Sequence, residues 1–183
     1  MPPFRPAAAF ALLMAVASPV AAETPDITGQ WQSVAPEAMG EVHATRAFTF
    51  GATDWSVVFN AYGDAAAQVP LFTLDVGGVY VIGGPSAAVP GANDAIFPAT
   101  RRQITAQSAA GVAMFGAMGC TLQQGVALPL TDAGCGFVPG LMQAMGEYDL
   151  VRIDGGQLFL GDRAGDLTKA RPAALTPFAL QRP

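Results

Sequence analysis

Glycine and proline interrupt this sequence at short intervals, and their spacing restricts the chain to short elements of secondary structure. The 183 residues include 21 Gly and 15 Pro, and 51% of the residues are hydrophobic. Closely spaced Gly and Pro argue against a bundle of long helices and favour many short strands joined by turns. Because the hydrophobic content is too high for a disordered chain, we expect a folded, all-β protein.

The charged residues exclude one class of partner and give little support to catalysis. The chain has 14 acidic and 9 basic residues, and its single histidine is His43. Nucleic-acid binding needs clustered Lys and Arg, so we expect no nucleic-acid partner. We expect His43 in a solvated loop, and the chain has no Gly-x-Ser-x-Gly turn to present a nucleophilic serine. The prediction is a protein that is not an enzyme, with no catalytic residue, bound metal or cofactor.

The N-terminal residues 1–22 have the pattern of a signal peptide. Arg5 provides a positive charge, residues 7–16 are apolar, and residues 20–22 are small enough for cleavage. The apolar run is about ten residues, whereas a membrane-spanning helix needs about 20. We therefore predict a single domain over residues 23–183, without a membrane segment after cleavage, located in a bacterial periplasm or secreted.

Two cysteines, Cys120 and Cys135, fall in the exported part of the chain. An oxidising compartment permits disulfides, so we expect these two residues to be bonded to each other. The alternative is a pair of free, buried thiols.

The alternation of bulky and polar residues indicates antiparallel strands. The clearest patterns cover residues 27–34, 46–50, 55–62, 70–76, 79–82, 95–104, 147–154 and 157–163, and weaker ones cover 125–130 and 172–180. Turns are expected at residues 51–54, at Gly77-Gly78 and at Gly155-Gly156, and one short helix is expected over residues 108–118. We predict an antiparallel β-barrel of about eight or nine strands with one short helix, and a β-sandwich is the alternative.

Bulky apolar residues on the predicted strands are the candidate ligand-binding residues. They are Phe48, Phe50, Trp55, Phe59, Phe72, Leu74, Tyr80 and Phe97. A packed core is the alternative role for each of them. Because the interior of a closed sheet is its one dry surface, we expect part of this set to line a pocket. The predicted partner is an apolar small molecule or a lipid acyl chain.

Two other functions stay open from the residues alone. The first is an envelope module with a packed barrel whose loops bind a protein. The second is an enzyme acting on an apolar substrate, which requires ionisable groups that face inward, and the residues to inspect are Glu147, Asp149, Arg46 and Arg152. Glu147 and Asp149 share one face of a predicted strand, and we expect that face to point to water.

The sequence also resembles known families. Gly29-x-Trp31 resembles the opening motif of lipocalin-like barrels, in which the Trp packs against an Arg from a late strand, and Arg163 is the candidate for that Arg. A longer set of motifs resembles the adenomatosis-polyposis-coli-down-regulated family. The motifs of this chain that carry the resemblance are Ile27-x-Gly29-x-Trp31-x-Ser33, Thr45-Arg46-x-Phe48-x-Phe50, Trp55, Tyr62-Gly63-Asp64, Pro70-Leu71-Phe72-Thr73-Leu74, Gly78-x-Tyr80, Glu147-Tyr148-Asp149-Leu150 and Leu158-Phe159-Leu160-Gly161-Asp162-Arg163.

This resemblance implies a lipocalin-like (calycin-like) β-barrel with a large apolar cavity for a lipid chain, such as the acyl group of a Wnt protein. Two family cysteines are replaced, one by Ala35 and one within residues 65–67, which is the pattern left by the loss of one disulfide. Cys120 and Cys135 match the remaining pair. Because animal members carry two such domains and a membrane anchor, the resemblance does not extend to Wnt inhibition.

Overall fold

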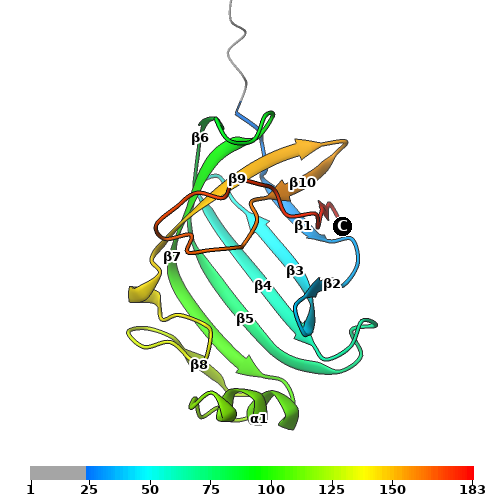
Figure 1. Ribbon diagram of the computed structural model, residues 1–183, viewed down its shortest axis with the longest axis vertical. Coiled ribbons are helices and arrows are strands. Elements are labelled where there is room, and N and C mark those ends of the chain that lie inside the picture. The colour runs from blue at the N-terminus through cyan, green and yellow to red at the C-terminus, as the bar shows by residue number, and fades with distance from the viewer. Residues whose placement is uncertain (1–23) are drawn as a thin grey trace, which may run out of the picture.

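The computed structural model describes residues 24–183, so the predicted signal peptide lies outside the described residues. This part of the chain forms one antiparallel sheet with a single α-helix and one short 3₁₀ helix (Figure 1). The elements are β1 (Gly29–Ser33), β2 (Glu37–Met39), β3 (Val42–Phe50), β4 (Asp54–Tyr62), β5 (Pro70–Val79), β6 (Val81–Pro85), β7 (Asn93–Ala106), α1 (Ala109–Ala117), β8 (Ala127–Pro129), η1 (Leu141–Gln143), β9 (Gly146–Asp154), β10 (Gln157–Leu160) and β11 (Leu180–Gln181). Among these elements, no helix has the length and hydrophobicity needed to cross a bilayer.

The sheet closes on itself. Its strands follow the order β1-β11-β10-β9-β7-β5-β4-β3, and β1 also pairs with β3, which completes a ring of eight strands. β2, β6 and β8 pair beside the ring, so the structure has eleven strands where the sequence predicted eight or nine. The predicted all-β, barrel-like fold is confirmed, and closure leaves few unpaired strand edges.

The predicted alternation along β3, β4 and β5 is realised as an inward and an outward face. Phe48 of β3 pairs with Val57 of β4, and Val57 pairs with Val76 of β5, with all three side chains buried. The neighbouring Val58 is exposed on the outer face. These strands curve side by side across the barrel wall in Figure 1.

The turn predicted at Gly77-Gly78 is wrong. Both glycines lie inside β5, which continues past them and pairs with β7. A Cβ atom on Gly78 would collide with the carbonyl oxygen of Pro98, so Gly78 allows the two backbones to approach closely. By contrast, the turn predicted at Gly155-Gly156 is confirmed, because both residues have the positive φ angles that a tight hairpin requires.

A β-bulge lies opposite these glycines. Gly77 pairs with Arg101 and Gly78 pairs with Ala99, so Thr100 is an extra residue on β7. The extra residue changes which side chains of β7 point inward: both Ala99 and Arg102 are buried, while Thr100 and Arg101 between them are exposed. The bulge therefore directs the Arg102 side chain, and not that of Arg101, to the interior.

One end of the barrel is filled by Trp31, Phe50 and other core side chains. The Trp31 indole donates a hydrogen bond to the carbonyl oxygen of Ile27 at 2.8 Å. The guanidinium above this ring belongs to Arg182, at 4.3 Å from the ring centroid. The predicted partner, Arg163, is wrong, because β11 pairs with β1 and brings the C-terminal residues over Trp31.

The opposite end is filled by α1, which lies below the strands in Figure 1. The short helix expected over residues 108–118 is confirmed as α1, and Ser108 caps it, since the Ser108 hydroxyl accepts a hydrogen bond from the backbone nitrogen of Gly111. Phe115 of α1 is fully buried and meets the Phe72 ring edge-on at 5.1 Å. The helix and this aromatic pair close the barrel at that end.

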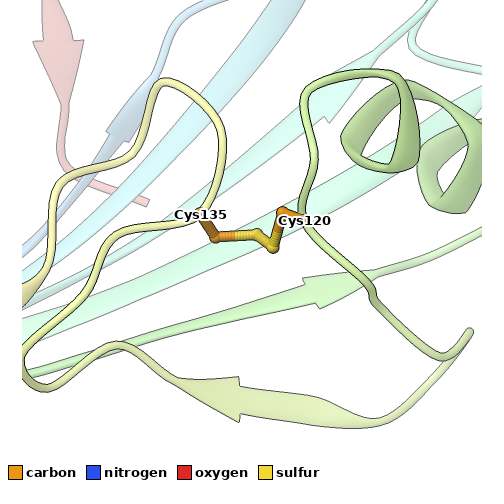
Figure 2. The surroundings of a disulfide bond; sticks show 2 residues. All are labelled: Cys120 and Cys135. Atoms are coloured by element: carbon orange, nitrogen blue, oxygen red, sulfur yellow. A yellow bond between two sulfur atoms is a disulfide. The ribbon is translucent and has the colours of Figure 1, made fainter.

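The predicted disulfide between Cys120 and Cys135 is confirmed (Figure 2). The bond links the segment after α1 to the loop before η1, with 5.3 Å between the two Cα atoms. Residues 137–139 of that loop follow directly, so the bond holds this loop against the helical end of the barrel.

Replacement of Gly78 by alanine should destabilise the protein by about 1 to 3 kcal/mol or more, because the new Cβ forces β5 and β7 apart. The matched control is Gly84→Ala, where a Cβ would meet no atom within 4 Å. Urea unfolding of the two variants measures the difference. Equal free energies of unfolding for both variants would contradict the close approach.

Removal of the disulfide in the double variant Cys120→Ala, Cys135→Ala should lower the free energy of unfolding by about 3 kcal/mol, as expected for a loop of about 15 residues. The wild type in reducing agent should show the same loss. Denaturant unfolding in both states measures it, and a stability independent of the thiol state would contradict this expectation.

Candidate functional site

A cavity of about 690 Å³ lies between the two filled ends of the barrel. Its wall is formed by the inner faces of β3, β4, β5, β7 and β9, with one residue each from β2 and β10, by residues 137–144, and by the segment 163–176 that follows β10. The volume falls within the range of about 300 to 1,000 Å³ that is typical of sites for small ligands.

Six of the eight candidate ligand-binding residues line this cavity. They are Phe48, Trp55, Phe59, Phe72, Leu74 and Phe97. Phe50 and Tyr80 lie outside the wall, in the aromatic cluster at the Trp31 end. Phe50 stacks on Phe48 with 5.5 Å between ring centroids, and the Tyr80 hydroxyl donates to the carbonyl oxygen of Gly51 at 2.9 Å.

The apolar part of the wall borders open space. Phe59 and Leu74 are cross-strand partners on the inward face, yet both are half-buried, whereas the inward residues directly before and after them on β4 and β5 are buried. Inward side chains of a packed core would be covered on all sides. Their accessibility therefore reflects the cavity next to them.

The cavity reaches the surface where its lining residues are exposed. On one side these are Phe137 and Gln143 of the loop held by the disulfide, and the Phe137 side chain is 58% exposed. On the other side they are Arg163 and Asp166 of the segment after β10. The mouth thus lies between two loop segments, one apolar and one charged.

Four charged side chains form a connected group on one side of the wall. Arg163 binds both Glu147 and Asp149, with 3.3 Å between its Nη1 and Oδ2 of Asp149. Arg102 Nη2 lies 3.4 Å from Oε1 of Glu147. The expectation that Glu147 and Asp149 face water is wrong, because β9 turns this face to the interior, where the two arginines neutralise the carboxylates.

Asp149 is the most buried member of this group, with 4% of its side chain exposed. Its Oδ1 accepts hydrogen bonds from the backbone nitrogens of Leu150 and Gly161, each at 2.7 Å. Burial raises the pKa of Asp149 above its ordinary value, although Arg163 and these two hydrogen bonds act in the opposite direction.

Arg102 is held from several sides and is also buried, with 5% of its side chain exposed. Its Nη1 donates to the carbonyl oxygen of Pro139 at 3.0 Å, and its Nη2 donates to that of Ala144 at 3.3 Å. Burial lowers the pKa of Arg102, and Arg163 lowers it further, while the charge of Glu147 raises it. The side chain joins β7 to the loop that borders the mouth.

Other ionisable residues named from the sequence lie elsewhere. Arg46 lines the cavity but is paired with buried Glu37 at 2.9 Å. Arg152 lies on the outside over the Phe159 ring. The solvated loop predicted for His43 is wrong, since this residue is half-buried in β3, away from the cavity wall.

Among residues 24–183, no group of three or more His, Cys, Asp or Glu side chains is arranged to hold a metal ion. The ionisable side chains of the wall are all paired: Arg102, Arg163, Glu147 and Asp149 bind one another, while Arg46 and Asp166 bind partners outside the wall. What the wall offers chemically is an extended apolar surface with a buried, hydrogen-bonding polar side.

Sequence reasoning missed Arg102 and the loop 137–144 as parts of the wall. Arg102 follows Arg101 in a polar stretch, and period-2 counting cannot place it, because the bulge at Thr100 shifts the period. Gly77-Gly78 inside a strand pattern was a usable signal, since glycines in a strand often mark a bulge. The loop carries no periodic signal, and its position depends on the disulfide.

The substitution Asp149→Asn should alter how the free energy of unfolding depends on pH. Because burial raises the pKa of Asp149, the folded protein binds this proton more tightly than the unfolded chain. Wild-type stability should therefore fall as pH rises from about 3.9, the unfolded pKa, through the raised folded pKa, and Asp149→Asn should lack this fall. Urea unfolding from pH 4 to 7 measures it, and parallel profiles for both proteins would contradict it.

Comparison with known proteins agrees with this architecture. A protein-family model described as Adenomatosis polyposis coli down-regulated 1 matches residues 8–123, which is more than half of the chain. No curated protein matches the chain at a significant level. The match includes β1 to β7 and α1, with the aromatic wall and Arg102, and ends before β9 and the two carboxylates of the charged group. The chain belongs to the adenomatosis polyposis coli down-regulated 1 family.

Proposed function

We propose that the protein is an exported, non-enzymatic binding protein that holds a lipid or another apolar small molecule inside its barrel. The observation that carries this proposal is the cavity of about 690 Å³, whose wall includes six large apolar side chains from four adjacent strands. Membership of a fold family alone would not specify a ligand, whereas a cavity of this size with a mostly apolar wall is suited to an apolar small molecule.

The energetics favour an acyl chain as the ligand. Each buried methylene contributes about 0.8 kcal/mol, so ten of them contribute roughly 8 kcal/mol before the cost of association is subtracted. A net binding free energy of about 8 kcal/mol corresponds to a dissociation constant on the order of micromolar, and because association also costs free energy, a chain of more than ten methylenes is needed to reach it. An acyl chain of ordinary length can therefore bind usefully without any polar contact.

The disulfide supports export. Cys120 and Cys135 are bonded, and such bonds persist in oxidising compartments such as the periplasm or the extracellular space. The signal-peptide pattern predicted for residues 1–22 points to the same destination.

The two alternative functions fit the cavity less well. A packed module would have a filled interior, and this barrel has an open one. An enzyme would need a reactive group at the wall, but among the described lining residues there is no histidine or cysteine, Glu147 and Asp149 are bound to arginines, and Asp166 is bound to Lys169. Binding of an apolar ligand requires the cavity and its apolar wall, and it does not require a reactive group.

The valines of β4 give a matched test of the cavity. Val57 lines it and Val58 lies next to it on the outer face, 38% exposed. Val57→Trp should fill part of the cavity and weaken fatty-acid binding at least tenfold, whereas Val58→Trp should leave it unchanged. Displacement of a fluorescent fatty acid, with thermal unfolding as a check on folding, measures this.

Lipids extracted from the purified wild-type protein should be visible by mass spectrometry and reduced in the Val57→Trp variant. A wild-type protein that carries no lipid and binds no fluorescent fatty acid would overturn the proposed function. Equal losses in the two valine variants would show that the ligand lies elsewhere.

A further inference from the structure

The stretch of chain over residues 103–146 is almost free of charge. It includes one charged residue, Asp132, although 13% of the whole chain is charged. The stretch contains α1, β8 and η1, and its loop over residues 137–144 forms one side of the cavity mouth. In Figure 1, α1 and β8 lie at the lower end of the barrel. The acidic character of the protein thus belongs to the other parts of its surface.

The same stretch is rich in exposed apolar side chains. Among residues 24–183, thirteen large apolar residues are exposed, and six of them lie in this stretch, which is little more than a quarter of that part of the chain. The six are Met118, Val126, Leu128, Phe137, Met142 and Met145. Because single exposed apolar residues are ordinary but gathered ones mark interaction sites, their positions decide what they mean.

Two of these side chains gather at the apolar side of the mouth. Phe137 lines the cavity and packs on Phe115 of α1, with 5.6 Å between the ring centroids. Met118, which follows α1, reaches the same loop, because a Cβ atom added to Gly136 would lie 3.1 Å from the Met118 sulfur. Phe137 therefore belongs both to the cavity wall and to the exposed apolar surface.

Two methionines continue this surface along the edge of the mouth. Met142 and Met145 flank Gln143 and Ala144, which line the cavity, while the two methionines themselves lie outside its wall. Their exposed fractions are 60% and 52%. We call the four exposed residues around this side of the mouth the apolar rim: Met118, Phe137, Met142 and Met145.

The other side of the mouth is charged. Arg163 and Asp166 line it, and Lys169, which pairs with Asp166, is 80% exposed. Near a bilayer, charged side chains stay at the level of the hydrated head groups, whereas apolar ones enter the hydrocarbon. The two sides of the mouth thus match the two layers of a membrane surface.

The composition of the rim favours a lipid surface over a protein partner. Protein interfaces use Arg anchors and a polar rim with regular hydrogen bonds, and residues 103–146 contain no Arg or Lys. A protein seated on the apolar rim would also cover the mouth. A bilayer would cover it with the phase in which an apolar ligand dissolves, so the ligand could enter or leave without crossing water.

We propose that the apolar rim binds to a lipid bilayer by inserting Phe137, Met142 and Met145 below the head groups, so that the mouth opens onto the bilayer. The role of the bilayer as the source of the ligand rests on the proposed function, whereas binding to the bilayer needs no ligand. Because the protein carries a formal net charge of −5, apolar insertion drives this binding, and attraction to anionic lipid does not.

The test measures flotation of the ligand-free protein with phosphatidylcholine vesicles. The full chain is expressed, so any N-terminal segment that is retained contributes equally to every variant. The variant is Met142→Ser, Met145→Ser, in which both residues are exposed and outside the cavity wall. The matched control is Val34→Ser, Val81→Ser, whose side chains lie outside residues 103–146 and have similar exposed fractions of 51% and 59%.

The methionine variant should weaken vesicle binding at least about tenfold, because two large apolar side chains no longer leave water. It should bind a fluorescent fatty acid in solution as the wild type does. The valine control should match the wild type in both measurements. Undiminished vesicle binding by the methionine variant, or an equal loss in the valine control, overturns the proposed docking.

The lipid composition of the vesicles tests the driving force. Mixing anionic phosphatidylglycerol into the phosphatidylcholine vesicles should weaken binding, because the acidic protein and the anionic surface repel each other. Binding that requires phosphatidylglycerol overturns apolar insertion as its cause.

Fluorescence gives a direct measurement of which surface enters the bilayer. A tryptophan in Met142→Trp should be quenched by vesicles of brominated phosphatidylcholine beyond the quenching seen for the wild type, which contains Trp31 and Trp55. The control Val81→Trp should show no added quenching. Equal quenching of the two variants overturns insertion through the apolar rim.

The same measurements separate docking from the proposed function. Fatty-acid binding in solution without vesicle binding overturns docking alone. Vesicle binding through the apolar rim by a protein that binds no fatty acid supports docking and overturns the proposed function. A dimer in sedimentation velocity that the methionine variant dissociates assigns the rim to a second copy of the chain and overturns docking on lipid.

Discussion

The pairing of β1 with both β3 and β11 is the constraint on which the cavity depends. β1 joins the first long strands to the C-terminal end of the chain, and this join converts an open sheet into a ring. In a closed sheet the inward side chains are shielded from water whether or not they fill the interior. Closure by backbone hydrogen bonds thus permits a hollow that an open sheet would not keep.

The two ends of the ring are closed differently, and neither end is where the cavity opens to solvent. At one end Trp31 packs under Arg182, and at the other α1 packs Phe115 against Phe72. Both ends are covered by buried side chains. The part of the wall around the mouth is built instead from two loop segments, one tied by the disulfide and the other by the contacts of Arg163 with β9. Access through a side wall of loops is compatible with a rigid barrel, because loops move more easily than paired strands.

Much of the wall could be predicted from alternation alone, and the parts that could not had two causes. Phe48, Phe59 and Leu74 were found because uninterrupted strands obey a period of two. Arg102 was missed because Thr100 interrupts that period, and Asp149 was assigned to water because a carboxylate is rarely buried without partners. Those partners come from other strands and are distant in the sequence.

The sequence by itself indicated the class of fold, which residues of the regular strands share a face, and the bond between the two cysteines, because these follow from local periodicity, turn chemistry and redox context. The tertiary structure alone decided that the barrel is hollow, that Arg182 covers Trp31, and that Arg102 meets Glu147 inside the wall. The physical reason is that packing volume and charge pairing depend on residues brought together by closure of the ring, and distances between such residues are not encoded in any local pattern.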